Sequence, residues 1–322
     1  MTDIVNWGVL GAANFAQNHM APAIHMARGA RLAALATRSA PRAEGFRAFC
    51  PDLKIHDSYE ALLADPGIEA VYVPLPNTLH VEWTRKCLEA GKHVLCEKPI
   101  AMKAGEIDDL IALRDRTGLM ATEAYMIVHH PQWQRAREIV ASGGIGRLAH
   151  VSAFFSYDNS DDPGNIRNRA ETGGGGLPDI GVYIFGCTRY VTGQEPTDIA
   201  ARIEFEQGVD TTAEITARFG EAGYAGMVSM RMFPRQEVTF HGSEGVLTVT
   251  CPFNANVFGQ AELRLERAGM SVTTERFPGV DHYVLQVENF CRTLREGTAY
   301  PWSLEDARGT QAMIDAVFAA AR

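Results

Sequence analysis

Short apolar segments alternate with segments of helical pattern throughout residues 5–124, and this alternation limits the possible folds more than any other feature of the chain. The apolar segments carry no polar face, which is typical of strands buried on both sides in a parallel sheet. Parallel neighbours need helical crossovers, and these are right-handed. We therefore expect an α/β fold with a doubly wound parallel sheet. The expected strands are residues 5–10, 31–37, 70–75, 93–96 and 120–124, and the expected helices are 13–28, 40–49, 58–64, 78–90 and 104–117.

Beyond about residue 125 the pattern changes to long strands separated by glycine turns, mainly over residues 197–274. Within 211–219 and 226–232 apolar and polar residues alternate, which is typical of an antiparallel sheet with one covered face. The sequence thus predicts a second domain, 125–322, of α+β class on a mostly antiparallel open sheet, after a first domain of residues 1–124. A strand is expected at 148–155, and helices at 132–142, 178–191, 283–296 and 303–321.

Composition and charge exclude several classes of protein. The chain has 322 residues, of which 46% are hydrophobic and 21% charged, as in a globular protein with a substantial core. A net charge of -9 argues against nucleic acid or an anionic membrane as the main partner. Neither a membrane-spanning run nor a signal peptide is evident, and the 6 cysteines form no C-x-x-C pair. We expect a cytoplasmic protein without structural zinc.

A candidate nucleotide turn follows the first expected strand. A dinucleotide-binding turn needs a glycine for the bend and two small residues further on, which let the pyrophosphate and the helix approach. Gly11, Ala13 and Ala16 occupy these positions, although only one of them is glycine. Small-residue turns are common, so the place directly after the first strand is what favours nucleotide binding. Asn14 and Phe15 would supply backbone N–H groups at the helix N-terminus.

The end of the second expected strand distinguishes NADP from NAD. An acidic residue there would bind the ribose 2′-hydroxyl of NAD, whereas an arginine accommodates the 2′-phosphate of NADP. The chain has Thr37, Arg38 and Ser39 here, with Arg42 one turn further on. Two hydroxyls and a guanidinium suit a 2′-phosphate, and Arg38 can also stack on the adenine. The alternative is an arginine in a solvated loop. Because neither Asp nor Glu stands at these positions, we expect NADP rather than NAD.

Lys98 lies just beyond the strand expected at residues 93–96. Ligands of open parallel sheets bind at the carboxyl ends of the strands, so a lysine there is placed for chemistry. The alternative is a surface lysine paired with Glu97. Pro99 makes the turn rigid, and the bond before it is a candidate for the cis form.

A run of four glycines, residues 173–176, leads into the helix expected at 178–191. Glycines allow a backbone to approach a ligand closely, and Pro178 suits the first helical position. Asp179 and Tyr183 are four residues apart, so they share one helical face. The alternative is a structural role for both residues, with Asp179 as an acid at the start of the helix and Tyr183 as an aromatic residue of the core. The 10 histidines show no metal-binding spacing, and we expect no metal.

Taken together, these motifs resemble the glucose–fructose oxidoreductase / inositol dehydrogenase (Gfo/Idh/MocA) family over nearly the whole chain. Tyr183, where many members carry His, resembles the branch of glucose–fructose oxidoreductase, D-xylose dehydrogenase and dimeric dihydrodiol dehydrogenase, as does the segment 165–167. Two departures are Ala13 in place of the middle glycine of the turn, and Pro178. The matching segments are residues 8–13, 74–80, 97–99, 174–183 and 283–290.

The resemblance implies an N-terminal Rossmann domain and roles for particular residues. Lys98, Asp179 and Tyr183 would be catalytic, with Tyr183 as the acid/base. Tyr125 and Arg167 would line the substrate pocket together with Asp179 and Tyr183. Further contacts with the nucleotide would come from Leu75, Asn77, His80, Glu97 and Lys98, beside Gly11, Ala13, Asn14, Phe15, Thr37, Arg38, Ser39 and Arg42.

The implied reaction is hydride transfer between nicotinamide and a carbinol carbon of a sugar or cyclic diol, by an NADP-dependent dehydrogenase. Tyr183 would exchange a proton with the substrate hydroxyl, and Lys98 would stabilise charge on the same oxygen. A homodimer or homotetramer formed through the C-terminal sheet is implied as well. Two alternatives stay open: a reductase of keto-sugars such as anhydrofructose, and a nucleotide sensor or corepressor without catalysis.

Overall fold

The structure is a computed structural model that describes residues 4–321, and it divides into two compact units. Unit 1 contains the described residues up to His129 together with His282–Arg308. Unit 2 contains His130–Asp281 and the described residues from Gly309 onwards. The domain limits expected from the sequence, 1–124 and 125–322, stay a prediction. The compact units differ from them mainly in the segment 282–308, which the structure places in unit 1.

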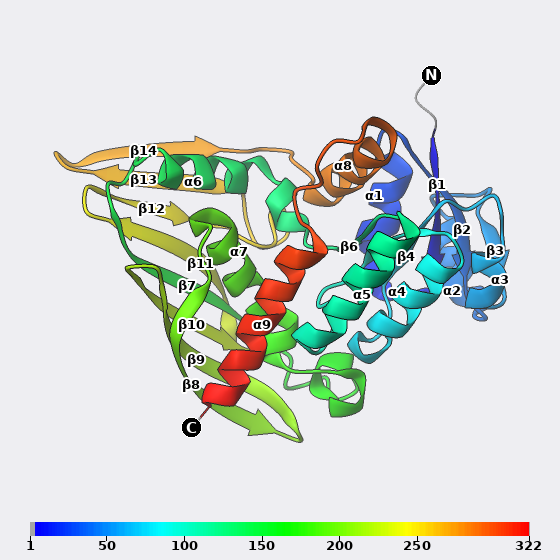
Figure 1. Cartoon of the computed structure of the whole chain (residues 1–322), viewed down its shortest axis with the longest axis horizontal. Coiled ribbons are helices and arrows are strands. Elements are labelled where there is room, and N and C mark those ends of the chain that lie inside the picture. Colours follow the sequence, from blue (N-terminus) through cyan, green and yellow to red (C-terminus); the bar gives the residue numbers. More distant parts are fainter. Residues whose placement is uncertain (1–3, 322) are drawn as a thin grey trace. The chain divides into compact units, whose positions relative to one another are not determined.

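Unit 1 is built on a six-stranded parallel sheet in the order β3-β2-β1-β4-β5-β6. This confirms the doubly wound α/β fold, and Figure 1 shows its strands in blue to cyan. The edge strand β3 was not expected, because it is short and lacks a continuous apolar run. The strands are β1 (Val5–Leu10), β2 (Ala30–Ala36), β3 (Lys54–His56), β4 (Ala70–Val73), β5 (His93–Cys96) and β6 (Ala121–Glu123).

Helices cover both faces of this sheet, so each face has its own core. Neighbouring strand residues such as Val71 and Tyr72 point into opposite cores, which explains why the strands lack a polar face. One core is closed by α1 (Ala21–Met26), α2 (Ala40–Arg47) and α8 (His282–Glu296), and the other by α3 (Tyr59–Leu63), α4 (His80–Glu89) and α5 (Ala104–Thr117).

Local sequence signals explain where several of these helices begin. Ser58 caps α3 by accepting a hydrogen bond from the backbone N–H of Ala61 at 3.2 Å. The segment expected as one helix over 13–28 is divided: a π-helical turn, Ala16–Met20, precedes α1. Pro22, the second residue of α1, follows this turn and has no N–H to donate to the preceding turn, so the regular α-helical pattern of hydrogen bonds is interrupted here.

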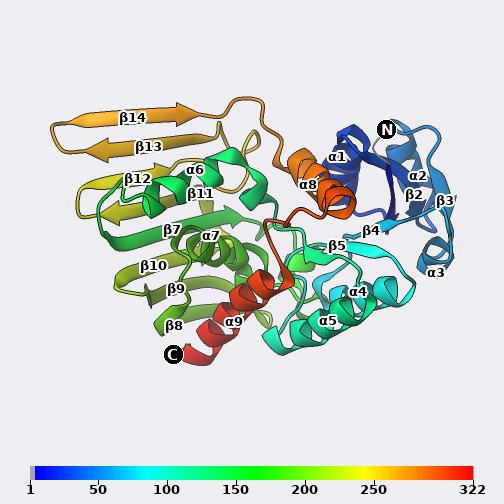
Figure 2. The same ribbon diagram turned by 45° about the horizontal axis from the view of Figure 1, so that its top comes forward.

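Unit 2 contains an eight-stranded sheet in the order β14-β13-β12-β11-β7-β10-β9-β8, which Figure 2 shows as one layer. Its strand pairs are antiparallel except for β10 and β7, so the mostly antiparallel open sheet is confirmed. The strands are β7 (Leu148–Asp158), β8 (Pro196–Glu206), β9 (Val209–Phe219), β10 (Ala222–Ser229), β11 (Arg231–Gly242), β12 (Gly245–Val249), β13 (Glu262–Arg267) and β14 (Ser271–Arg276).

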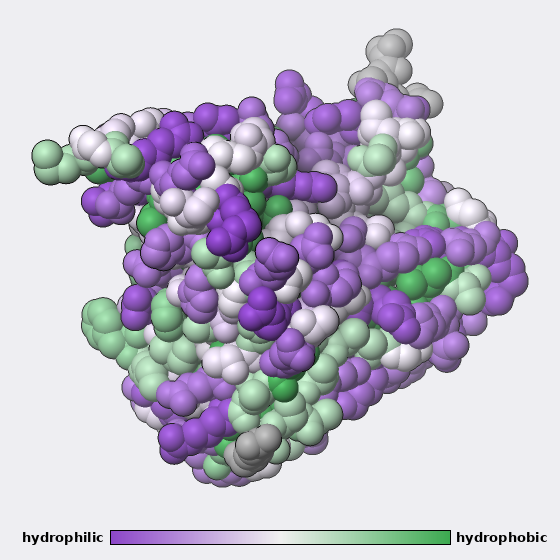
Figure 3. Space-filling model, turned by 60° about the vertical axis from the view of Figure 1, so that its left-hand side comes forward, coloured by the Kyte–Doolittle hydropathy of each residue, from purple (hydrophilic) through white to green (hydrophobic). Residues whose placement is uncertain are grey.

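Two helices, α6 (Pro131–Ala141) and α7 (Val182–Thr192), lie over one face of this sheet (Figures 1 and 2). The last helix, α9 (Leu304–Ala320), belongs to unit 2 from Gly309 onwards. Phe205, Phe233 and Met270 of unit 2 are large apolar side chains exposed to solvent. Figure 3 shows hydrophobic residues interspersed with hydrophilic ones over the face that it turns forward. Within residues 4–321, no helix is long and apolar enough to cross a membrane.

Candidate active site

The predicted nucleotide-binding segments of unit 1 follow strands that are neighbours in the sheet. In the sheet order, β1 lies between β2 and β4, and β5 is next to β4. Connections leave β1 toward β2 on one side and reach β4 on the other, which is the topological switch point where open α/β sheets bind ligands. The segments that begin after the carboxyl ends of these strands are 11–15, 37–39, 75–80 and 97–98.

Gly11 makes the bend after β1 with a φ of +88°, a conformation that favours glycine. A Cβ at this position would lie 3.0 Å from the hydroxyl of Tyr59 and 3.2 Å from Cδ2 of Leu75, so space as well as conformation excludes a side chain. The backbone N–H of Gly11 donates to the carbonyl of Ala36 in β2 at 2.9 Å. Ala13 and Phe15 are half-buried and Asn14 is exposed.

Cationic side chains lie next to this turn. Nη1 of Arg42, at the start of α2, donates to the carbonyl of Ala12 at 3.2 Å. Arg38 and Arg42 are both exposed, whereas Thr37 and Ser39 are half-buried. The hydroxyl of Thr37 accepts a hydrogen bond from the backbone N–H of Ser39 at 3.2 Å, which fixes the turn between β2 and α2.

The Lys98 turn is held by groups of β4. The hydroxyl of Tyr72 donates to Oε1 of Glu97 at 2.6 Å, and Oε2 of Glu97 accepts from the backbone N–H of Lys98 at 3.2 Å. Burial, followed by the nearby Glu97 carboxylate, raises the pKa of Tyr72 well above its ordinary value, so its hydroxyl keeps its proton and donates. The Lys98–Pro99 peptide bond is cis, and Lys98 itself is half-buried.

Two other residues of unit 1 that were predicted to bind ligands, His80 and Tyr125, have no exposed surface. His80 is 0% exposed, and its ring nitrogens lie 2.7 Å from the carbonyl oxygens of Pro99 and Leu75. Both ring nitrogens thus contact backbone carbonyls, so the ring of His80 binds the turns at Leu75 and Pro99 and does not point toward solvent. Tyr125 is also 0% exposed and stacks on Trp302 with ring centroids 4.3 Å apart. Asn77 is half-buried at the start of a 3-10 turn, Asn77–Leu79.

In unit 2, the buried Asp179 is the centre of a polar cluster whose other members are half-buried. Its Oδ2 accepts a hydrogen bond from the hydroxyl of Tyr157 at 2.7 Å and forms an ion pair with Nε of Arg167 at 2.8 Å. Asp179 is 8% exposed, and burial together with its carboxylate raises the pKa of Tyr157. The carboxylate of Asp179 raises the pKa of Arg167 as well. Asp179 and Arg167 were predicted from the sequence, whereas Tyr157 was not.

Tyr183 lies in α7, one helical turn beyond Asp179, and is 6% exposed. Its ring contacts Phe155 and Phe253, with centroids 5.7 Å and 5.5 Å away, and these two phenylalanines stack on each other. An apolar wall of this kind fixes the direction of the phenol ring. The helix expected at 178–191 begins with a π-helical turn, Leu177–Gly181, which carries Asp179. Such turns occur frequently at functional sites.

The glycine run is required because Asp210 and the Arg167 loop lie against it. A Cβ at Gly174 would overlap the carbonyl oxygen of Arg167, and one at Gly175 would overlap the carboxylate of Asp210. Oδ2 of Asp210 accepts from the backbone N–H of Leu177 at 2.6 Å, at the start of the π-helical turn. Asp210 is 2% exposed, and burial raises its pKa to about 7. Asp210 was not predicted from the sequence, because it lies among other polar residues of β9 and no motif marks it.

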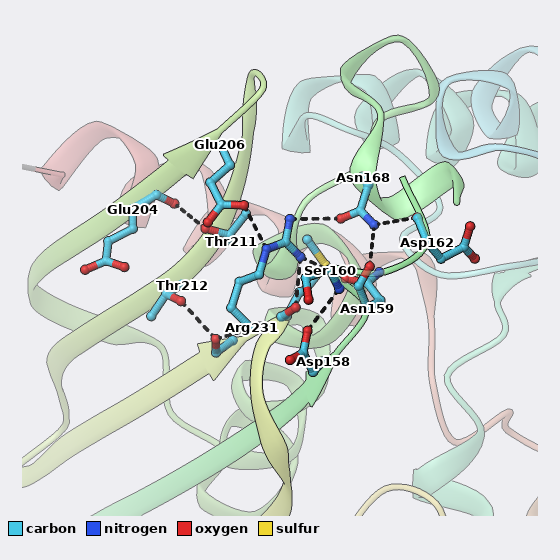
Figure 4. A network of polar contacts seen from close by, with 12 residues as sticks. Asp158, Asn159, Ser160, Asp162, Asn168, Glu204, Glu206, Thr211, Thr212 and Arg231 are labelled. Atoms are coloured by element: carbon cyan, nitrogen blue, oxygen red, sulfur yellow. Dashed lines mark hydrogen bonds and ion pairs between the residues drawn. The ribbon is translucent and has the colours of Figure 1, made fainter. Parts of the chain in front are cut away.

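The loop that carries Arg167 is held by Arg231 of β11 (Figure 4). Nε of Arg231 pairs with Glu206 at 2.8 Å, Nη1 donates to Oδ1 of Asn159 at 2.9 Å, and Nη2 donates to Oδ1 of Asn168 at 3.2 Å. Nδ2 of Asn168 in turn donates to the carbonyls of Asn159 and Asp162, both at 2.9 Å. Because Asn168 follows Arg167 directly, this network fixes the loop at the point where Arg167 leaves it.

Metal-binding chemistry needs clustered ligands, and thiol chemistry needs a thiol of lowered pKa. Among residues 4–321, no group of three or more His, Cys, Asp or Glu side chains is arranged to hold a metal ion. All six cysteines are buried free thiols. Burial raises the pKa of Cys87 to about 12 and that of Cys291 to about 11, which keeps both protonated and unreactive.

Residues 5–125 match the sequence model of an oxidoreductase family with an NAD-binding Rossmann fold, and residues 133–248 match the C-terminal domain model of the GFO/IDH/MocA family. The chain belongs to the Gfo/Idh/MocA oxidoreductase family. This confirms the resemblance drawn from the motifs. The first matched segment lies in unit 1 and the second in unit 2. Helix α8, which returns to unit 1, is included in neither family model.

Relatives of known activity match over nearly the whole length of this Gfo/Idh/MocA chain. It is 35% identical to a dTDP-3,4-didehydro-2,6-dideoxy-alpha-D-glucose 3-reductase of Saccharopolyspora spinosa, over 91% of this chain and 89% of that one. It is 32% identical to the D-xylose 1-dehydrogenase (NADP(+)) 2 of Haloferax volcanii, over 98% of this chain and 97% of that one. A solved 3-ketoreductase from Actinomadura kijaniata, in complex with NADP and TDP-benzene, matches with a TM-score of 0.90 and 28% identity, covering 99% of this chain and 98% of that one.

Proposed function

We propose that the protein is an NADP-dependent oxidoreductase that transfers a hydride between nicotinamide and the carbinol or carbonyl carbon of a sugar or cyclic diol. The observation that carries this proposal lies within unit 1. The Gly11 turn, Arg38 and Lys98 all follow the carboxyl ends of strands in one parallel sheet, on either side of its switch point. A nucleotide-binding edge that also carries a lysine is what a nicotinamide-dependent enzyme of this family needs.

The residues of unit 1 fit a dinucleotide with a 2′-phosphate. The bend at Gly11 leaves no space for a side chain, so backbone N–H groups of Ala13, Asn14 and Phe15 would bind the pyrophosphate. The exposed guanidinium groups of Arg38 and Arg42 would pair with the 2′-phosphate beside the hydroxyls of Thr37 and Ser39. Bound NADP supplies the chemistry that no side chain offers, namely acceptance or donation of a hydride. NADP in the related 3-ketoreductase and xylose dehydrogenase supports this assignment.

The chain's own residues would handle the proton and the charge on the substrate oxygen. Tyr183 would take the hydroxyl proton in oxidation and return it in reduction. Lys98 would hydrogen-bond that oxygen and stabilise its negative charge. Asp179, fixed by Tyr157 and Arg167, would accept a hydrogen bond from a neighbouring hydroxyl of the substrate and orient it. The apolar wall of Phe155 and Phe253 would keep the phenol of Tyr183 in one direction.

Reduction of a nucleotide-linked keto-sugar is a second candidate. It is favoured by the sugar 3-reductase of Saccharopolyspora spinosa and the 3-ketoreductase of Actinomadura kijaniata, which match most of this chain. The same residues would serve it, with Tyr183 donating the proton. The two candidates differ in direction and in whether the substrate carries a nucleoside diphosphate.

The experiment is a matrix of NADP, NADPH, NAD and NADH against aldoses, inositols, cyclic diols and a TDP-linked 3-keto-sugar, followed through the absorbance of the reduced cofactor. Lys98→Ala is measured beside the wild-type protein. We expect the wild-type protein to turn over with NADP or NADPH, and we expect Lys98→Ala to lose this turnover. Turnover confined to the NAD pair would contradict the cofactor assignment. Tight NADPH binding without turnover on any compound would favour a nucleotide sensor instead.

We also propose that the chain forms a homodimer or homotetramer through the eight-stranded sheet. Exposed apolar side chains on its strands, among them Phe205 of β8 and Phe233 of β11, support self-association. Light scattering coupled to size exclusion measures the mass directly. A monomer at all protein concentrations would contradict this proposal, and the catalytic assignment would be unaffected.

A further inference from the structure

The peptide group between Pro99 and Ile100 is held at both ends by buried side chains. Its carbonyl oxygen lies 2.7 Å from Nδ1 of His80, and its N–H donates to Oε1 of Glu123 at 3.0 Å. His80 is 0% exposed and Glu123 is 2% exposed. Residues 97–103 belong to no helix or strand, so no regular ladder of hydrogen bonds fixes this turn. The orientation of the peptide group, and with it the backbone next to Lys98, therefore depends on these two side chains.

The two ring nitrogens of His80 contact two different backbone carbonyls. Nε2 lies 2.7 Å from the carbonyl of Leu75, as Nδ1 does from that of Pro99. A carbonyl oxygen can only accept, and a neutral imidazole has a single N–H, so neutral His80 donates to one of the two carbonyls and only an imidazolium donates to both. Lys98 is the charged group that faces His80. Burial is the largest influence on the pKa of His80 and lowers it; the two carbonyl acceptors oppose that shift, and the Lys98 cation adds to it. The pKa lies below its ordinary value, which favours the neutral imidazole at about pH 7.

Glu123 uses both carboxylate oxygens for fixed N–H donors. Oε1 accepts from Ile100, and Oε2 accepts from Nε1 of Trp302 at 3.0 Å. The charged groups facing it are Glu97 and Lys98. Burial raises the pKa of Glu123 to about 7, while the two donors act in the opposite direction. A donor on one end of a peptide group and an acceptor on the other polarise it in the same sense, so each hydrogen bond strengthens the other.

We propose that His80 and Glu123 are positioning residues for Lys98, which hold the two ends of the Pro99–Ile100 peptide group, with Nδ1 of His80 donating to the carbonyl of Pro99. The inference rests on the proposed role of Lys98 in the reaction. It assigns to His80 a function different from direct contact with the cofactor. It also explains why two polar side chains are buried beside a short turn, since neither contacts solvent.

The protonation of His80 is measured by NMR on protein labelled with ¹⁵N-histidine at about pH 7. The signal of His80 is assigned as the one that disappears in His80→Asn and again in His80→Gln. We expect Nδ1 of His80 to carry a directly bonded proton. A proton on Nε2 alone would overturn the proposal, because the carbonyl of Pro99 would then lack a donor. This arm needs no substrate and no activity.

Two substitutions separate the contacts of His80. The amide nitrogen of Asn takes the place of Nδ1 and can donate to Pro99, whereas that of Gln takes the place of Nε2 and can donate to Leu75. If the grip on Pro99 positions Lys98, we expect His80→Gln to lower kcat about tenfold or more below His80→Asn. The NADPH Kd of the two variants should agree within about threefold, and their melting temperatures within about 3 °C. Matched controls are His25→Asn and His25→Gln, at an exposed position of α1.

Equal kcat in His80→Asn and His80→Gln, with equal losses of stability, would show a merely structural residue and overturn the inference. Glu123→Gln tests the other end, because Gln has one acceptor oxygen for two N–H donors. We expect kcat to fall with little change in NADPH Kd, and Glu89→Gln, exposed at the end of α4, to leave both unchanged. Full activity in Lys98→Ala would instead overturn the proposed function and this inference with it. Loss of activity in Lys98→Ala with full activity in His80→Gln and Glu123→Gln would overturn the inference alone.

Discussion

The carboxylate of Asp210 occupies the space that a side chain at position 175 would need. Gly175 also has a φ of +125°, a conformation that other residues rarely adopt. Glycine is therefore required here for two independent reasons. The closeness of the two residues lets Asp210 reach the N–H of Leu177 and hold the turn that carries Asp179.

Gly175→Ala should destabilise the protein by at least about 3 kcal/mol, since backbone strain adds to overlap with a buried carboxylate. Gly193→Ala is the matched control, because Gly193 has a φ of +64° but nothing within 4 Å of the added Cβ. There we expect about 1–2 kcal/mol, from the backbone alone. Urea unfolding of both variants measures the difference. Equal losses of stability in the two variants would mean that the Asp210 carboxylate moves away from the added Cβ at little cost in free energy.

Asp210 should make stability depend on pH in a recognisable direction. Its pKa is raised from 3.8 to about 7 in the folded chain, so between about pH 4 and pH 7 the folded state keeps a proton that the unfolded state releases. The free energy of unfolding then falls as pH rises through this window, by up to about 4 kcal/mol, and changes no further from this group above it.

Asp210→Asn is uncharged at all pH values and should lack this contribution. Urea unfolding of both proteins at about pH 5 and about pH 8 tests the prediction, because only the change between the two conditions is compared. We expect the loss of stability from about pH 5 to about pH 8 to be smaller in the variant. The same pH dependence in both proteins would show that Asp210 does not titrate in this range.

Arg38 should determine the preference for NADP. Arg38→Ala removes a guanidinium from the expected 2′-phosphate, and a hydrogen bond to a charged group contributes about 1.5–3 kcal/mol. We expect the Kd of NADPH to rise about tenfold or more and that of NADH to change little. Arg47→Ala, at the end of the helix α2 that follows Arg38 and paired with Glu44, is the control. Fluorescence titration gives both constants, and equal weakening of NADPH and NADH would contradict the assignment.

Arg231→Lys should loosen the loop that carries Arg167, because an ammonium cannot reproduce the planar fork that joins Glu206, Asn159 and Asn168. We expect faster amide hydrogen exchange over residues 159–172 and a rise in substrate KM of about tenfold. Arg235→Lys, on the same strand and paired with Glu237, is the control. Unchanged exchange in this loop would show that the network does not hold it.

The sequence predicted those elements whose signals are local. Strand β5 and helix α5 have the bounds expected, since an apolar run defines one and Gly118 ends the other in a left-handed conformation. The short edge strand β3 was missed because its residues are exposed or half-buried and show no pattern. The π-helical start of the helix with Asp179 was missed as well, since no residue type marks it.

The candidate site was predictable where its residues share a motif. Lys98, Asp179 and Tyr183 belong to such motifs. Tyr157, Asp210 and Glu123 do not, because each acts on a segment far away in the sequence, and only the folded sheet brings them there. The return of α8 to unit 1 was equally hidden, since an amphipathic helix does not show which core its apolar face enters.

The most direct test of the account measures turnover and NADPH affinity together in Lys98→Ala and Tyr183→Phe. Each change removes one group that handles the substrate's oxygen and leaves the Gly11 turn and Arg38 intact. We predict that turnover with NADP falls at least ~100-fold in each variant, while the NADPH Kd stays within about threefold of that of the wild-type protein. Turnover close to that of the wild type in either variant would contradict the proposed chemistry.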